Sequence, residues 1–300
     1  WQVKWELEDL GFRYVEPRRY KEIATAIRSV HGVKLLDYSA DPSHNRSVFT
    51  FAGETASLQE AVLRLYAKAL DVIDLRTHTG EHPRIGVVDV VPFVPLEDDK
   101  MTDCVISPKQ IASAVEKRFS VPVYLYGHAA GTDSRRNLED IRRGGFEKLM
   151  AKMAESAWAP DYGKSSPHPT AGASAFGARG PLIAYNINLA TNQLAVAKKI
   201  AVAVRSSSGG LSHVKAMGVR LSERDLVQVS MNLTNYRQTS IVHVFDAVSQ
   251  EAAKHGVAIL ESEIIGLIPS DALWDVNAHD LQLRNSVTNQ ILETKLMATK

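Results

Sequence analysis

The chain has 300 residues, of which 45% are hydrophobic and 23% charged, as in a globular protein with a sizeable core and not in a disordered chain. Its 35 basic and 34 acidic residues leave a net charge of +1, which excludes a general attraction to nucleic acid or to an anionic membrane. Cys104 is the single cysteine, so no internal disulfide can form, and we expect a buried thiol in a reducing, cytoplasmic compartment. No apolar run approaches the ~18 residues that span a bilayer, and the N-terminal residues do not resemble a signal peptide.

The first half of the chain is predicted to alternate helices and strands, because apolar residues recur at helical spacing in some segments and alternate in others. The expected elements are a helix over 16–30, strands over 33–36 and 46–52 with a polar loop over 38–45 between them, a helix up to Val72, a strand over 85–94, a helix up to Phe119, a strand over 121–127 and a basic helix or loop around 135–143. Ser57 and Glu60 have capping-box spacing, and Ser107 precedes Pro108 in the order preferred at a helix start, so we expect the two longer helices to begin there.

Residues 158–180 contain several Pro, Gly and Ser residues and predict no regular element. After them, strands and helices are predicted in the order β-α-β-β-α-β, over 182–189, 192–205, 214–221, 226–233, 239–254 and 257–268. This is the order of a ferredoxin-like fold. We therefore expect an α/β (α+β) protein with two sheet-and-helix subdomains, 1–178 and 179–300, and a ligand bound between them.

The segment 77–95, THTGEHPRIGVVDVVPFVP, carries the most chemical information. It places His82 and Arg84 in a loop directly before a predicted buried strand, and rigid elements often hold functional groups on such loops. A histidine exchanges a proton near neutral pH, which suits general acid–base catalysis. The alternative for His82 is a solvated histidine in a turn.

A metal site is a second hypothesis for the same loop. His78 lies four residues before His82, which on a helix would place both side chains on one face as zinc ligands. Gly80 and Pro83 disfavour a helix here, so a site formed by the two histidines and Asp89 is the weaker hypothesis.

A polar loop is also expected after the first strand, with polar or charged side chains at Asp37, Ser39, Asp41, His44 and Arg46. Asp and Ser are frequent in turns, where their side chains bind nearby backbone groups. The functional alternative is a carboxylate that holds an amidinium group or orients an imidazole.

Several longer segments, in order, resemble the glutamate formiminotransferase family. They are LLDYSADPSHNRSVFTFAG (35–53), DLRTHTGEHPRIGVVDVVPFVP (74–95), VPVYLYGHAA (121–130), WAPDYG (158–163), TAGASAFGARGPLIAYNINL (170–189), QVSMNLTNY (228–236) and EIIGLIP (263–269). The match spans roughly residues 20–270. The length of the chain resembles that of the stand-alone bacterial type, which lacks a fused cyclodeaminase domain. The resemblance implies transfer of the formimino group of N-formimino-L-glutamate to N5 of tetrahydrofolate, in histidine degradation.

The resemblance also implies the roles of individual residues. His82, in the family's GEHPR motif, is the expected general base and acid, with Asp37 or Asp41 in support. The expected substrate- and folate-binding residues are Ser39, Asn45, Arg46, Arg84 and Arg179. Family members have two subdomains with a charged tunnel between them and are usually dimeric, so we expect a homodimer that takes tetrahydrofolate as co-substrate and needs no metal, nucleic acid or membrane.

Two positions depart from the family pattern. Animal members have an aspartate where this chain has Ser39, and the family's first segment resembles ECVPNFSEG, where residues 6–14 here are ELEDLGFRY. The altered N-terminus motivates an alternative function, a folate-binding protein of the same fold without catalysis. The possible metal ligands motivate another, a metal-dependent hydrolase of a related amidine.

Overall fold

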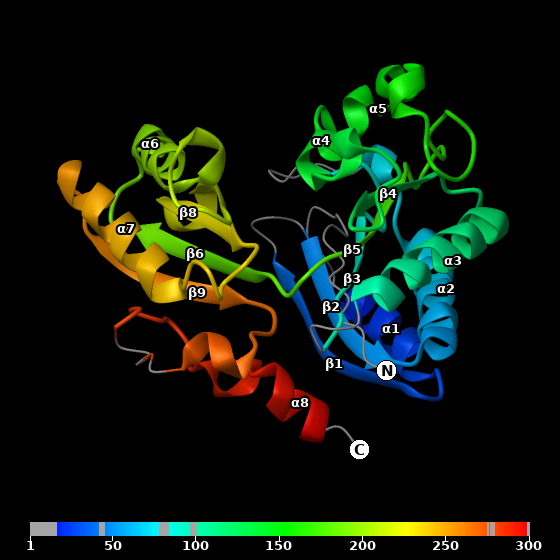
Figure 1. Cartoon of the computed structure of the whole chain (residues 1–300), viewed down its shortest axis with the longest axis horizontal. Helices are drawn as coiled ribbons and strands as arrows, with labels where there is room; N and C mark the ends of the chain where they lie inside the picture. Colours follow the sequence, from blue (N-terminus) through cyan, green and yellow to red (C-terminus); the bar gives the residue numbers. More distant parts are fainter. Residues whose placement is uncertain are drawn as a thin grey trace. The chain divides into compact units, whose positions relative to one another are not determined.

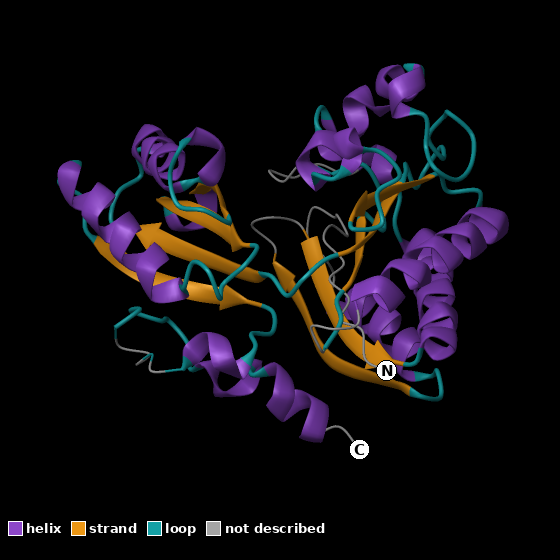
Figure 2. Cartoon of the chain, in the orientation of Figure 1, coloured by secondary structure: helices purple, strands orange, loops and turns teal. Residues whose placement is uncertain are grey.

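The computed structural model describes residues 17–41, 46–77, 84–96, 101–274, 276 and 280–298. The chain divides into two compact units after Arg179, the second comprising Gly180–Ala298 (Figure 1). Each unit combines helices and β-sheet, as predicted (Figure 2). In the part of the chain that is described, no helix is long and apolar enough to cross a membrane.

The first unit opens with an antiparallel hairpin covered by two helices. It consists of α1 (Pro17–Arg28), β1 (Val33–Asp41), β2 (Arg46–Gly53) and α2 (Thr55–Val72). The prediction of a loop from residue 38 onward was wrong, because β1 continues to Asp41 in register with β2. The reason is a cross-strand aromatic pair, in which the ring centroids of Tyr38 and Phe49 are 6.4 Å apart in a stacked arrangement.

A three-stranded parallel sheet forms the rest of this unit's framework. Its strands are β3 (Val90–Phe93), β4 (Val123–Gly127) and β5 (Ser174–Ala178), in the order β3-β5-β4, and α3 (Met101–Phe119) packs against it. The central strand β5 lies in the segment for which no element was predicted. Its five residues are small or apolar and all buried, so they lack the alternation that marks a half-exposed strand.

Two predicted helix starts and one predicted strand were wrong in detail. The long helix α2 begins at Thr55 with Glu54 as N-cap and no side-chain cap hydrogen bond, so Ser57 does not form a capping box there. The helix α3 begins at Met101 and contains Pro108 in its interior. The predicted strand 85–94 is regular only in β3, since the residues before Val90 make irregular contacts that are described below.

The remaining elements of the first unit are short. They are the helices α4 (Leu138–Arg142) and α5 (Gly145–Met153) and the 3-10 helices Leu75–Thr77, Asp133–Arg135 and Ser156–Trp158. The basic segment 135–143 is only partly a surface feature, because Arg135 and Arg142 are both buried. The thiol of Cys104 is buried as predicted, and burial raises its pKa to about 12.

The second unit has the predicted βαββαβ order. Its elements are β6 (Ile183–Leu189), α6 (Leu194–Val204), β7 (Val214–Leu221), β8 (Leu226–Leu233), α7 (Ile241–Lys254) and β9 (Ile259–Ile265). Each neighbouring pair of strands is antiparallel, and the sheet order is β7-β8-β6-β9. The ferredoxin-like fold of this unit is therefore confirmed. A further helix, α8 (Leu292–Ala298), follows β9 and was not predicted.

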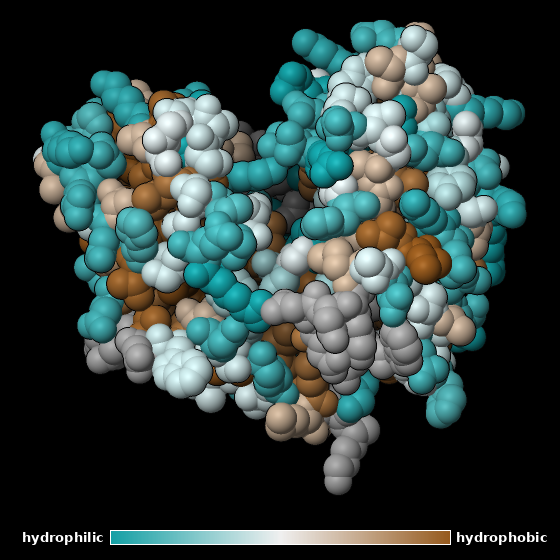
Figure 3. All heavy atoms as spheres, viewed as in Figure 1, coloured by the Kyte–Doolittle hydropathy of each residue, from teal (hydrophilic) through white to brown (hydrophobic). Residues whose placement is uncertain are grey.

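Each unit has its own hydrophobic core. In the first unit one cluster joins the hairpin, α1, α2, α3 and the parallel sheet, and a smaller one joins that sheet to α4 and α5. In the second unit a cluster lies between the four-stranded sheet and the helices α6 and α7. In the view of Figure 3, hydrophilic side chains cover most of the visible surface and apolar residues show in smaller patches.

Candidate functional site

The candidate site is built around the GEHPR motif, residues 80–84. Residues 78–83 lie outside the described part of the chain. His82 and His78 therefore have no described position. Arg84 is the described residue nearest to His82 in the chain. The residues before and after the motif are described, and they show how the framework is held.

A second segment, residues 168–173, binds the chain on both sides of the motif. Before the motif, the backbone N–H of Leu75 donates to the carbonyl of Thr170, with 2.8 Å between nitrogen and oxygen. After it, the N–H of Val87 donates to the carbonyl of Ala171 at 3.0 Å. The chain before the motif and the chain after it are thus hydrogen-bonded to the same stretch of backbone.

Two glycines allow this close approach. Gly86 and Gly172 form an isolated antiparallel bridge. A Cβ on Gly86 would lie 1.9 Å from the carbonyl oxygen of Ala173, and one on Gly172 would lie 2.0 Å from that of Ile85. Gly172 also has a φ of +70°, a backbone conformation that residues other than glycine rarely adopt. Backbone contact at this distance requires glycine on both segments.

Asp89 organises the residues that follow the motif. Its carboxylate is fully buried, and its Oδ1 accepts hydrogen bonds from the N–H groups of Ile85 at 2.7 Å and Gly86 at 3.2 Å. Its Oδ2 lies 2.9 Å from Nη2 of Arg142 in an ion pair. A buried carboxylate is stable only with such partners, and these bonds explain why the chain before β3 is irregular.

These contacts bear on the metal hypothesis. Asp89 was considered as a ligand together with His78 and His82, which lie outside the described residues. Its Oδ1 accepts backbone hydrogen bonds, and its Oδ2 is in an ion pair with Arg142. Among the residues that the structure describes, no group of three or more His, Cys, Asp or Glu side chains is arranged to hold a metal ion.

Arg84, the last residue of the motif, has a buried guanidinium. The residue is 6% exposed, and its Nη2 lies 2.8 Å from Oε1 of Glu147, a largely exposed side chain on α5. Arg84 directly precedes Ile85 and Gly86, whose N–H groups donate to the buried carboxylate of Asp89. These hydrogen bonds fix the backbone next to Arg84. A fixed, planar guanidinium of this kind is suited to bidentate binding of a carboxylate.

The hairpin β1–β2 carries the second group of candidates. Cross-strand pairing joins Asp37 to Thr50, Ser39 to Val48 and Asp41 to Arg46. Because side chains alternate along a strand, Asp37, Ser39 and Arg46 share the face opposite to Tyr38 and Phe49. Asp37 is half-buried, Ser39 is exposed and Arg46 is 6% exposed.

The pairing also separates these candidates along the hairpin. Asp37 lies four residues from Asp41, the partner of Arg46, which is roughly 13 Å along the strand. A register shift between Leu35 and Asp37 precedes it, and such bulges often redirect a functional side chain. The side chain of Asp41 and all of Asn45 lie outside the described residues.

Arg179 follows the central strand of the parallel sheet. Its N–H donates to the carbonyl of Phe93 at 3.0 Å, at the carboxyl ends of β5 and β3. At the same edge the N–H of His128, which follows β4, donates to the carbonyl of Ala178 at 2.9 Å. Carboxyl ends of parallel strands are frequent ligand sites. Sequence reasoning gave His128 no role, although its position after a predicted strand was a usable signal.

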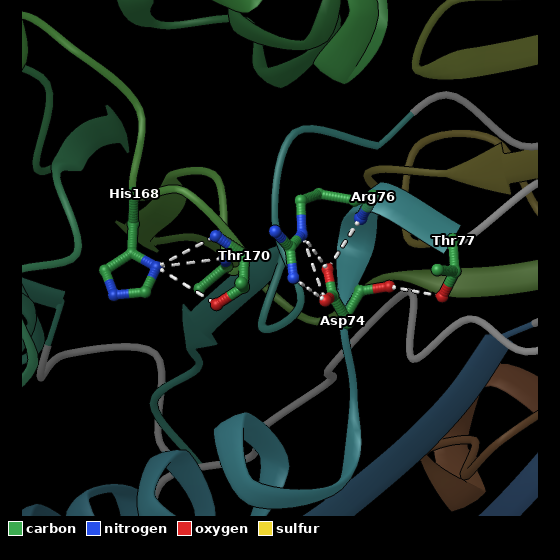
Figure 4. Close-up of polar contacts among 6 residues, drawn as sticks. Asp74, Arg76, Thr77, His168 and Thr170 are labelled. Atoms are coloured by element: carbon green, nitrogen blue, oxygen red, sulfur yellow. Dashed lines mark hydrogen bonds and ion pairs between the residues drawn. The ribbon is translucent and has the colours of Figure 1, made fainter.

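His168 was also missed, and the sequence contains no signal for it. It is half-buried, and its Nδ1 accepts hydrogen bonds from the N–H groups of Ala171 at 3.0 Å and Thr170 at 3.3 Å (Figure 4). Burial lowers the pKa of His168 below its usual value, which favours the neutral ring that these bonds require.

Comparison with known proteins identifies the family. The family model for the N-terminal subdomain of the formiminotransferase domain matches residues 16–179, and that for the formiminotransferase domain matches 184–297. The chain is 46% identical to glutamate formimidoyltransferase of Streptococcus pyogenes serotype M1, over 92% of both chains. It is 45% identical to the Thermoplasma acidophilum protein of the same name, over 93% of this chain and 92% of that one.

A longer relative also matches. The formimidoyltransferase-cyclodeaminase of Mus musculus is 40% identical over 85% of this chain and 48% of its own length. The similarity to the two shorter proteins extends over nearly their whole length. With both family models matched in order and covering most of the sequence, this chain belongs to the formiminotransferase family.

Proposed function

We propose that this protein is a glutamate formimidoyltransferase, which transfers the formimino group of N-formimino-L-glutamate to N5 of tetrahydrofolate. The observation that carries the proposal is 46% identity over 92% of both chains with a protein of that name. The buried contacts that hold the residues on both sides of the GEHPR motif give the proposal its structural support.

The reaction requires one proton to be moved between two nitrogens. N5 of tetrahydrofolate forms a bond to the electrophilic amidine carbon and loses its proton, and the bond from that carbon to the glutamate nitrogen breaks as this nitrogen gains a proton. One imidazole can accept the first proton and deliver it to the leaving group. We assign this role to His82. Holding the two substrates in contact supplies a further part of the rate.

Substrate binding is assigned to the arginines. Both substrates carry carboxylates, and the forked donors of a guanidinium match a carboxylate in two parallel hydrogen bonds. Arg84 and Arg46 are both 6% exposed, so a carboxylate bound there would be shielded from water and held more strongly than on the surface. Arg179, at the sheet edge, is the third candidate. Asn45 is a further candidate for substrate binding.

The acidic and hydroxyl candidates have supporting roles in this proposal. Asp37 or Asp41 orients the imidazole or stabilises its charged form, as carboxylates do beside catalytic histidines. Ser39 replaces the aspartate of animal members and is exposed, so we assign it to hydrogen bonding with substrate. A change of Asp37→Asn that lowers kcat more than Asp41→Asn would identify Asp37 as the supporting carboxylate.

Several finer expectations belong to the same proposal. We propose tetrahydrofolate as the co-substrate, no metal requirement, a cytoplasmic location and a homodimer. The division into subdomains is proposed at 1–178 and 179–300. Light scattering of the purified chain tests the dimer, since a mass of one chain, 33.0 kDa, would contradict it.

The test of the function is a transfer assay with formiminoglutamate and tetrahydrofolate, comparing wild type with His82→Ala. We expect turnover by the wild type and a loss of at least about a hundredfold in the folded mutant, the usual contribution of a general acid–base group. Folate binding without transfer would instead support the binding protein. Hydrolysis of the amidine that is lost on chelation and restored by zinc would support the metal-dependent hydrolase.

A further inference from the structure

His168 closes a short turn through both its side chain and its backbone. Its N–H donates to the carbonyl of Gly172 at 2.8 Å, and the N–H of Gly172 donates back to the carbonyl of His168 at 3.0 Å. Inside the turn, Nδ1 of His168 accepts from the N–H groups of Ala171 and Thr170 (Figure 4). The imidazole therefore replaces water as the partner of two backbone donors.

The hydrogen bonds connect His168 to both sides of the GEHPR motif through single peptide groups. The carbonyl of Thr170 and the N–H of Ala171 belong to one planar peptide, which donates to the imidazole and accepts from the N–H of Leu75. The next peptide donates from Gly172 to the His168 carbonyl and accepts at Ala171 from the N–H of Val87. Rotation of either peptide plane would move the carbonyl that holds Leu75 or Val87.

The charged residues next to Leu75 are paired with each other. Asp74 and Arg76 form an ion pair of 2.5 Å between Oδ2 and Nη2 (Figure 4). Asp74 Oδ1 also accepts from the backbone N–H of Arg76 at 3.0 Å, and this pairing lowers the pKa of Asp74. Burial lowers the pKa of His168. The hydrogen bonds of its ring are therefore made by a neutral imidazole with an unprotonated Nδ1.

We propose that His168 is a positioning residue for the transfer reaction. Its Nδ1 orients the peptide that holds Leu75, before the GEHPR motif, and its backbone carbonyl binds the peptide that holds Val87, after the motif. The kinetic part of this inference rests on the proposed function, since it assumes that His82 carries the proton. The structural part does not depend on that assumption.

Two substitutions test the inference. His168→Ala removes the acceptor, whereas His168→Asn supplies a carbonyl oxygen that binds nearby backbone N–H groups in turns without titrating. For His168→Ala we expect faster amide hydrogen exchange at Ala171 and Leu75, which depend on the imidazole, and a smaller change at Val87. We also expect a kcat about tenfold lower, with KM within about twofold of wild type. His168→Asn should restore slow exchange and most of kcat. The control is His243→Ala, an exposed position on α7.

The two measurements separate the possible failures. If exchange at Leu75 and Ala171 is the same in His168→Ala as in wild type, the inference is overturned, whether or not the protein transfers formimino groups. An unchanged kcat in His168→Ala, measured on an active wild type, overturns it as well. If the wild type shows no transfer but His168→Ala accelerates exchange, the proposed function fails and the structural role of His168 is supported.

Discussion

Asp89 and Arg142 form a buried ion pair, with 2.9 Å between Oδ2 and Nη2 and side-chain exposures of 0% and 7%. They are 53 positions apart in the chain, and the pair joins α4 to the residues that follow the GEHPR motif. The carboxylate of Asp89 also accepts hydrogen bonds from the N–H groups of Ile85 and Gly86. Loss of Arg142 would therefore affect the framework of the candidate site.

Arg142→Met should lower the free energy of unfolding by about 3–5 kcal/mol, since it leaves a buried carboxylate without a counter-charge. The measurement is urea unfolding at pH 7. The neighbouring Arg143, an exposed residue paired with Asp140, provides the control, and Arg143→Met should cost less than about 1 kcal/mol. Equal losses in the two variants would show that the buried pair has no special role in stability.

Gly86→Ala should be destabilising by roughly 1–3 kcal/mol or more, because the added Cβ would meet the Ala173 carbonyl oxygen at 1.9 Å. The two backbone segments would have to separate, so transfer activity should fall as well. Thermal unfolding and the transfer assay measure the two effects. Gly180→Ala is the matched control, since nothing lies within 4 Å of its added Cβ. A Gly86→Ala protein as stable as that control would contradict the close approach.

Arg84→Lys should raise KM for formiminoglutamate about tenfold to a hundredfold, because an ammonium group cannot reproduce two parallel hydrogen bonds to a carboxylate. Initial rates over a range of donor concentrations give this value. Glu147→Gln keeps Arg84 but removes the charge of its exposed partner, so it should change KM for formiminoglutamate less than Arg84→Lys does. If KM is unchanged in Arg84→Lys, this arginine does not bind the donor.

His168 should make stability depend on pH in the acidic range. Burial lowers its pKa in the folded state, so below about pH 6.5 the unfolded chain binds a proton that the folded chain does not. His168 therefore contributes to the free energy of unfolding above pH 6.5. This contribution is lost as the pH falls through the pKa of His168 in the folded state, which lies below its value in the unfolded chain. Thermal midpoints from pH 8 to 5 should fall more for wild type than for His168→Asn. Parallel curves for the two proteins would mean that His168 titrates normally.

The second unit was predictable because each of its elements follows a local pattern. The strands β6 and β8 place apolar residues at alternate positions, and α7 repeats its buried residues at helical spacing. In β6 the other face carries Asn186 and Asn188, which are buried but polar, so the alternation is visible in the sequence. The strand β5 has no such polar face. The β-α-β-β-α-β order then left few arrangements to consider.

The strand β5 could not be predicted in this way, because both of its faces are buried. Its Gly177 lies against the ring of Tyr126, where a Cβ would be 2.5 Å from the ring carbon Cδ1. The need for glycine there comes from a neighbouring strand about 50 positions away. Local sequence holds no trace of that contact, and Gly and Ser otherwise suggest a loop.

The sequence alone determined the family and its expected histidine, because a long ordered set of motifs identifies both without coordinates. It also determined which residue types are available to bind carboxylates. Only the tertiary structure decided that Asp89 is a buried anchor for Arg142 and not an open ligand, and that Arg84 is shielded from water. It also decided that His168 binds the backbone of residues 170 and 171, which in turn holds Leu75 before the motif. These properties depend on burial and on partners distant in the chain, and a linear pattern does not record either of them.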